Sequence, residues 1–144
     1  MSMEIASDGR LEQMILDVLP DDPAVARYLP YFKDTSKEAD EETRKALEPF
    51  TMEPDGLLLH EGLIYVPAVD EIKLEILRSC HDGKAAGHLG QEKTLELISR
   101  DYYWPGMRRF TKDYVWTCET CARRKAPRHR RHGKLHPLPI PAGP

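Results

Sequence analysis

Hydrophobic residues recur every three or four positions near the start of the chain, a spacing that places them on one face of a helix. A first amphipathic helix is predicted after a cap at Asp8, ending before Pro20. Its apolar face comprises Leu11, Met14, Ile15, Val18 and Leu19. Asp22 followed by proline predicts the start of a second helix, which Pro30 limits. Its apolar face comprises Val25, Tyr28, Leu29 and Phe32.

A third helix is indicated by Thr35 and Glu38, which have the spacing of a capping box, and it runs toward Leu47. Its apolar face is thin, so we expect it to lie at the surface. The acidic run 38–42 is typical of solvated surface.

The period changes between Pro54 and Pro67. Leu57–Leu59 and Leu63–Val66 flank the glycine-containing turn His60-Glu61-Gly62, which predicts a β-hairpin over residues 57–66. We expect His60 to be an exposed polar residue of the turn.

Helical spacing returns after Asp70 and continues nearly to the end. Leu74, Leu77 and His81 share one predicted face, and a further helix is expected from Gln91 to about Arg100. The next helix is predicted from about Pro105, and one apolar stripe along it carries two cysteines. That stripe comprises Met107, Phe110, Tyr114, Cys118 and Cys121. The predicted class is therefore mainly α with one small β-hairpin.

Two histidines and two cysteines stand in short-spaced pairs. Six residues separate His81 from His88, two separate Cys118 from Cys121, and 29 lie between the pairs. Tetrahedral zinc takes four nitrogen or sulfur ligands in such short–long–short spacing. We therefore predict one structural Zn²⁺ ion, whose binding contributes on the order of 10 kcal/mol to folding.

Other roles for these residues stay open at this point. A CxxC pair also serves redox chemistry, and all four side chains could be unliganded core residues. Cys80 is an alternative thiolate, although its position favours a buried free cysteine. Four protein ligands leave no position for water, which disfavours a catalytic zinc and a stand-alone zinc enzyme.

Charge divides the chain into two unlike halves. Residues 1–69 hold 15 acidic and 6 basic side chains, whereas residues 70–144 hold 9 acidic and 15 basic ones. The second half therefore suits a polyanion such as DNA, better than the overall net charge of −3 suggests. A solvated tail or a nuclear-import signal is the alternative for its basic run.

Candidate DNA-binding residues are the cations of this run and exposed cations on the predicted helices. The first group comprises Arg123, Arg124, Lys125, Arg128, Arg130, Arg131 and Lys134. The second comprises Lys93, Arg108 and Arg109, with Arg100 and Lys112 as further candidates. The prolines that follow predict an extended connector.

Taken together, several motifs resemble one family. They are His81-Asp82, Gly87-His88-Leu89-Gly90, Lys93-Thr94, Tyr103-Trp104-Pro105-Gly106-Met107, Cys118-Glu119-Thr120-Cys121 and the Pro137-Leu138-Pro139 tail. Their order and spacing resemble the amino-terminal HHCC zinc-binding domain of retroviral-type integrases, in particular fungal gypsy-type LTR retrotransposon integrases. The resemblance is strong over residues 56–144 and weaker before them.

The resemblance implies a zinc-braced, helix-turn-helix-like bundle of three helices. His81, His88, Cys118 and Cys121 match the family's ligand positions. It divides the chain into an extension (1–68), an HHCC domain (69–126) and a basic, proline-rich linker (127–144). The chain stops at Pro144, where the catalytic core would begin, so we expect no catalysis by this chain alone.

The function implied is DNA binding and multimerisation in support of DNA integration. We expect DNA partners at the long-terminal-repeat ends or the target, a homo-oligomer, and a nuclear location with a cytoplasmic particle stage. Neither a membrane nor a small-molecule substrate is expected. The alternative is a protein-interaction or oligomerisation module adopted by a host gene, which suits the acidic first half better. Whether the chain is part of a polyprotein stays open.

Overall fold

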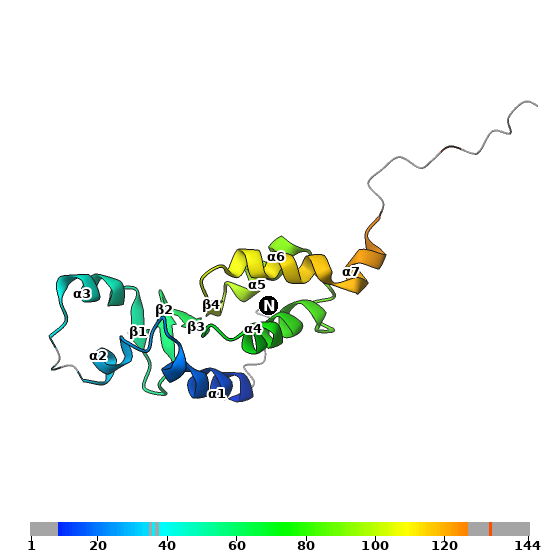
Figure 1. Cartoon of the computed structure of the whole chain (residues 1–144). Coiled ribbons are helices and arrows are strands. Elements are labelled where there is room, and N and C mark those ends of the chain that lie inside the picture. The colour runs from blue at the N-terminus through cyan, green and yellow to red at the C-terminus, as the bar shows by residue number, and fades with distance from the viewer. Residues whose placement is uncertain (1–8, 35, 37, 127–132, 134–144) are drawn as a thin grey trace, which may run out of the picture.

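A computed structural model describes residues 9–34, 36, 38–126 and 133, which form helices around a small sheet (Figure 1). The α-helices are α1 (Gly9–Val18), α2 (Leu29–Lys33), α3 (Glu41–Leu47), α4 (Asp70–Leu77), α5 (Gln91–Ile98), α6 (Met107–Thr117) and α7 (Glu119–Arg124). A 3₁₀ turn, η1 (Leu19–Asp21), follows α1, and a π-helical turn, η2 (Arg78–Asp82), follows α4. The predicted mainly α class is confirmed. Among the described residues, no helix is both long enough and apolar enough for a membrane span.

The predicted hairpin is present, but it belongs to a four-stranded sheet. Strands β1 (Phe50–Met52), β2 (Leu58–His60), β3 (Leu63–Tyr65) and β4 (Tyr102–Tyr103) lie in that order. The first two pairings are antiparallel, and β3 pairs with β4 in parallel. Ile64 N donates to Asp101 O at 2.8 Å, which ties the hairpin to the chain after α5.

His60 is a strand residue, and its predicted exposed position in the turn is wrong. It pairs with Leu63, so the loop is Glu61-Gly62 alone, with φ angles of 50° and 85°. Two consecutive positive φ values match the twist of a two-residue hairpin loop. The His60 ring is half-buried because it stacks on Tyr103, with centroids 3.9 Å apart.

Before the sheet, three predicted helix boundaries are wrong. The second helix does not start after Asp22, because residues 23–28 form turns and α2 begins at Leu29. Pro30 lies in the first turn of α2 instead of ending a helix, and its missing N–H there costs no intrahelical bond. The third helix begins at Glu41, after Asp40, whose carboxylate accepts a hydrogen bond from the Thr43 hydroxyl. Asp40 therefore marks the helix start that Thr35 was expected to mark. Thr35 lies outside the described residues, as does Asp8, the predicted cap of the first helix.

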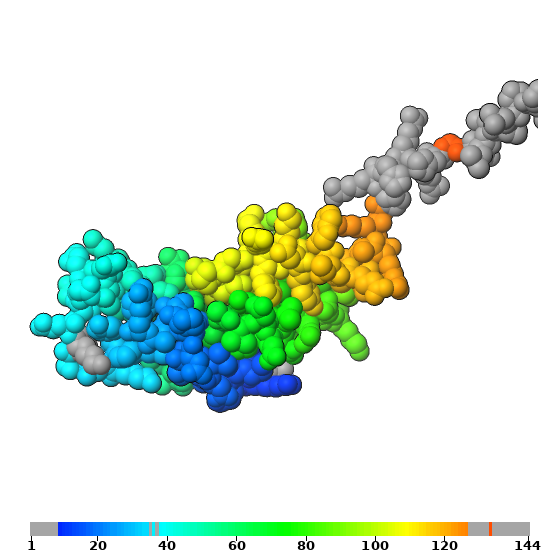
Figure 2. Space-filling model, in the orientation of Figure 1, coloured from blue at the N-terminus to red at the C-terminus, as the bar shows by residue number. Residues whose placement is uncertain are grey.

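The larger hydrophobic core joins α1 to the helices that follow the sheet. Ile15 of α1 is fully buried in the same cluster as Ile72, Ile76 and Trp104. Figure 2 shows α1 packed directly along α4. A smaller cluster of Leu19, Val25, Leu29, Leu58 and Tyr65 holds the other end together. The division at residue 68 stays a prediction, although the core crosses it.

A buried carboxylate links the extension to the end of the hairpin. Asp22 is 3% exposed, and its oxygens accept hydrogen bonds from Ala24 N at 2.8 Å, Ala68 N at 3.1 Å and the Tyr65 hydroxyl at 3.2 Å. Asp22 thus caps a turn, not the helix predicted to begin there, and it also anchors the chain just before α4. Burial and the Asp22 carboxylate raise the pKa of Tyr65.

Candidate metal centre

His81 enters the centre on the π-helical turn η2. Gly83 N donates to Arg78 O at 3.0 Å, five residues back, so this turn is wider than that of an α-helix. The wide turn buries both Cys80 and His81. A side chain at Gly83 would place its Cβ 2.6 Å from Ser79 O, so the turn requires glycine here.

This geometry corrects the predicted face that joined Leu74 and Leu77 to His81. Leu74 is only half-buried, and the buried residues of α4 are Ile72, Ile76 and Leu77. The extra residue in the π turn shifts the phase of the helix. His81 therefore points inward although it does not continue a leucine stripe.

His88 is placed by a loop that folds back onto η2. His88 N donates to His81 O at 2.9 Å. Gly87 and His88 both have left-handed backbone conformations, with φ of 60° and 58°. That region is unfavourable for most side chains, although histidine enters it more readily than bulky residues do. The strained turn brings the His88 ring next to that of His81 in an edge-to-face arrangement, with 5.0 Å between centroids.

The cysteines lie at a break between two helices, so the predicted continuous stripe is wrong at its end. α6 ends at Thr117, and Cys118 has an extended backbone with φ −68° and ψ 114°. Cys118 then caps α7, where Ala122 N donates to Cys118 O at 3.0 Å. Cys121 lies in the first turn of α7. The break turns both thiols toward the histidines.

Four ligand atoms converge at this point: His81 Nε2, His88 Nδ1 and the two Sγ atoms. All lie within 4.8 Å of one another. His81 Nε2 lies 3.4 Å from His88 Nδ1 and 3.3 Å from Cys121 Sγ, and Cys118 Sγ lies 3.4 Å from His88 Nδ1. Zinc bonds of about 2.0–2.3 Å in a tetrahedron require roughly 3.3–3.8 Å between ligand atoms. The residues therefore fit a closed zinc site.

Comparison with known proteins agrees with this chemistry. Residues 69–127 match the family described as "Integrase zinc binding domain", and all four convergent residues fall inside the match.

This segment is an integrase zinc-binding domain.

The relatives are transposon polyproteins. The chain is 31% identical over 86 residues to the "Transposon Tf2-3 polyprotein" of Schizosaccharomyces pombe, and equally to the "Transposon Tf2-4 polyprotein" of that organism. The aligned part is 59% of this chain and 6% of each relative, so the chain spans a small fraction of their length. The predicted relationship to retrotransposon integrases is confirmed, and so is the single structural zinc.

A hydrogen-bonded chain behind His81 fixes its tautomer in the zinc-binding domain. Thr94 Oγ1 donates to Leu89 O at 3.1 Å, so its oxygen can accept from His81 Nδ1–H at 3.2 Å. The proton on Nδ1 leaves the Nε2 lone pair free for zinc. Burial lowers the pKa of His81, which also favours the neutral, metal-binding ring. Thr94 itself is fully buried on α5.

Asp82 and Tyr114 link η2 to α6 beside the zinc ligands. The Tyr114 hydroxyl donates to Asp82 Oδ2 at 2.5 Å, and Asp82 Oδ1 lies 3.6 Å from His88 Nδ1. Burial and this hydrogen bond raise the pKa of Tyr114. Burial and the neighbouring Cys118 raise the pKa of the Cys121 thiol, a trend that a bound dication reverses. Sequence reasoning missed Thr94, Asp82 and Tyr114 as supports, because their partners are distant in sequence.

Cys80 is not part of the zinc centre. Its side chain lies in the main core with 2% exposure, and it is absent from the convergent group of ligands. Burial, with a contribution from Asp101, raises the pKa of Cys80 to about 11, so its thiol stays protonated at neutral pH. The interpretation as a buried free cysteine agrees with this position.

The predicted DNA-binding cations differ in their surroundings. Lys93, Arg108, Arg109, Lys112, Arg123, Arg124 and Lys125 are all exposed on α5, α6 or α7 and its end. Arg128, Arg130, Arg131 and Lys134 lie outside the described residues, as does most of the predicted linker. Several exposed cations face carboxylates: Arg108 lies 3.9 Å from Glu92, and Arg123 contacts Glu119. Within the described part of the chain, Arg124 and Lys125 form no ion pair.

Proposed function

We propose that this integrase zinc-binding region binds DNA and helps to assemble integrase multimers on it, without itself catalysing strand transfer. The observation that carries the proposal is a groove beside the zinc centre where cations from two helices meet. Lys93 of α5 lines it together with Arg124 and Lys125 at the end of α7. Zinc holds these helices in place, because Cys121 belongs to α7 and the Thr94 support belongs to α5.

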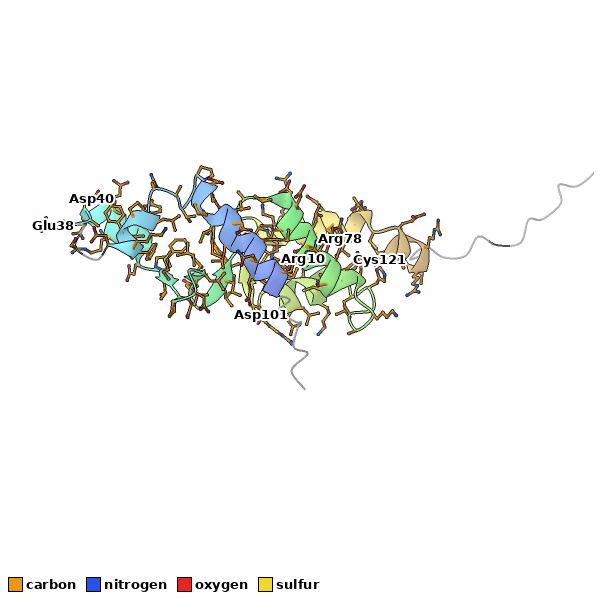
Figure 3. The ribbon with its side chains drawn as sticks, turned by 90° about the horizontal axis from the view of Figure 1, so that it is seen from below. Arg10, Glu38, Asp40, Arg78, Asp101 and Cys121 are labelled. Atoms are coloured by element: carbon orange, nitrogen blue, oxygen red, sulfur yellow. The ribbon has the colours of Figure 1, made fainter. Side chains whose placement is uncertain are left out.

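The electrostatic layout supports the same proposal. Glu38 and Asp40 lie at one end of the molecule and Cys121 near the other (Figure 3). In this proposal the end of the molecule with the zinc centre contacts the DNA phosphates. The opposite end, which carries Glu38 and Asp40, faces away from them. Phosphate binding by clustered cations is strongly salt-dependent, since bound counterions are released. In this proposal Arg123, Arg124, Lys125, Lys93, Arg108 and Arg109 contribute phosphate contacts, joined by Arg128, Arg130, Arg131 and Lys134.

The experiment is a salt titration of DNA affinity by fluorescence anisotropy, on zinc-loaded protein and a long-terminal-repeat end duplex. Alanine at both Arg124 and Lys125 should weaken binding and reduce the salt slope by about one unit for each phosphate that is no longer bound. The matched control replaces Arg44 and Lys45, two exposed cations of the acidic end, and should change neither quantity. Equal effects of the two double variants would refute the proposal.

Multimerisation is supported by a different feature, the acidic surface at the start of α3. Glu41 and Glu42 begin α3, next to Asp40, and all three face solvent. A stable oligomer by light scattering, without DNA affinity at low salt, would favour the protein-interaction alternative. We also propose that the region works in the nucleus, after a cytoplasmic particle stage if the parent element is active.

A further inference from the structure

Trp116 is the one large hydrophobic side chain that is strongly exposed among the described residues, at 72%. It lies on α6, two residues before the break at Cys118. An indole is rarely left in water on a small monomeric domain, because it carries a large apolar surface. The other tryptophan, Trp104, is buried at 1% exposure and belongs to the core. Trp116 contributes to neither the larger nor the smaller core cluster.

The ring forms one wall of the basic groove. This groove has a volume of about 880 Å³. Gly87, His88 and Gly90 line it on the η2–α5 side, and Val115, Cys121 and Ala126 on the α6–α7 side. The zinc ligands His88 and Cys121 therefore hold its two sides together.

Charge around Trp116 favours an anion that also carries a flat ring. Lys125 Nζ lies 5.0 Å from the centroid of the indole. Arg124 and Lys93 add positive charge, and Glu92 is the acidic residue of the lining. Glu92 lies 3.9 Å from Arg108, which offsets its charge. A flat aromatic face with cations beside it is the combination that binds unpaired nucleotides, where bases stack and phosphates pair with lysine or arginine.

We propose that Trp116 is a stacking platform for an unpaired base of single-stranded DNA, with Arg124 and Lys125 on the neighbouring phosphates. This deepens the proposed function and rests on it. Inside a duplex each base face is covered by its neighbours, so the indole can be used only at an unpaired or frayed end. Binding to the phosphates of a duplex requires only the cations and not the indole. The groove thus distinguishes a DNA end with free bases from continuous duplex.

The test compares single-stranded oligothymidylate with a duplex of equal length, on zinc-loaded protein. Trp116→Ala should weaken single-strand binding about 5- to 150-fold, the range for removing one stacked base, and change duplex binding less than about twofold. Trp116→Phe should restore part of the affinity. Zinc stoichiometry and circular dichroism should be unchanged, because the removed ring is exposed.

Intrinsic fluorescence gives a second readout, because the chain has only two tryptophans. Oligothymidylate should quench the wild-type emission, and the quenching should disappear in Trp116→Phe, where only buried Trp104 remains. Unchanged single-strand affinity in Trp116→Ala, or equal weakening for both DNAs, would overturn the stacking proposal. A changed oligomeric state with unchanged DNA affinity would also overturn it, and would assign Trp116 to a protein contact. Absence of any DNA binding by wild type would instead refute the proposed function itself.

Discussion

Thr94 offers the sharpest perturbation of the zinc centre short of removing a ligand. Its hydroxyl accepts from His81 Nδ1 at 3.2 Å and donates to Leu89 O at 3.1 Å. Thr94→Val keeps the shape of the side chain and removes both hydrogen bonds. The His81 ring then loses its side-chain acceptor at Nδ1, so the Nε2–H tautomer, which cannot bind zinc through Nε2, becomes more competitive.

The expected cost follows from burial. Thr94 and His81 are both 0% exposed, so water does not replace the missing partners. Removing a partner that orients a metal-bound histidine lowers metal affinity about 10- to 100-fold, or roughly 1.4–2.7 kcal/mol. The carbonyl of Leu89 is also deprived of a donor, which adds about 1 kcal/mol to the destabilisation of the fold.

The assay is a competitive zinc titration against a chromophoric chelator at fixed pH. Thr94→Ser should keep most of the wild-type affinity because it keeps the hydroxyl. Thr51→Val, at an exposed position of β1, is the matched control and should have no effect. The reasoning is refuted if Thr94→Val binds zinc within about twofold of wild type, or if Thr94→Ser is as weak as Thr94→Val.

Three further predictions test the core and the remaining thiol. Ile15→Ala should reduce the free energy of unfolding of the zinc-loaded chain by about 2–5 kcal/mol in urea, because this fully buried side chain packs in the main core; a reduction under about 1 kcal/mol would mean that α1 is dispensable. Thr111→Val should stabilise the chain by about 1 kcal/mol, since the buried Thr111 hydroxyl has no hydrogen-bond partner among the residues that the structure describes. Clear destabilisation would show that it has one. The zinc-loaded protein should react hardly at all with a thiol reagent at mildly alkaline pH. After a chelator removes the zinc, Cys118 and Cys121 should react quickly. Cys80 should react much more slowly, because its pKa is raised to about 11. Fast labelling of three thiols would contradict that order.

The chemistry of the centre was more predictable from the sequence than its backbone. Histidine and cysteine pairs identify zinc ligands without any knowledge of the fold, because ligand type and spacing carry the information. The π turn before Gly83 and the helix break at Cys118 were not predictable from periodicity. Both depart from the helical period at the ligands, where close backbone approach and metal geometry outweigh the apolar pattern.

Contacts between residues distant in sequence explain why β4 and the position of His60 were not predicted from the sequence. Residues Tyr102-Tyr103 form a two-residue strand only because β3, nearly 40 residues earlier, offers a parallel partner. The hairpin was predictable because its turn and both strands are local in sequence. His60 was misplaced for the same reason as β4: the ring on which it stacks belongs to Tyr103.

The central claim is that His81, His88, Cys118 and Cys121 together hold one structural zinc ion. X-ray absorption at the zinc edge of the intact, zinc-loaded chain tests it most directly. The predicted result is one zinc per chain with two nitrogen ligands at about 2.0–2.1 Å and two sulfur ligands at about 2.3 Å. A third sulfur ligand would show that Cys80 is recruited, and a shell of nitrogen and oxygen alone would contradict the site.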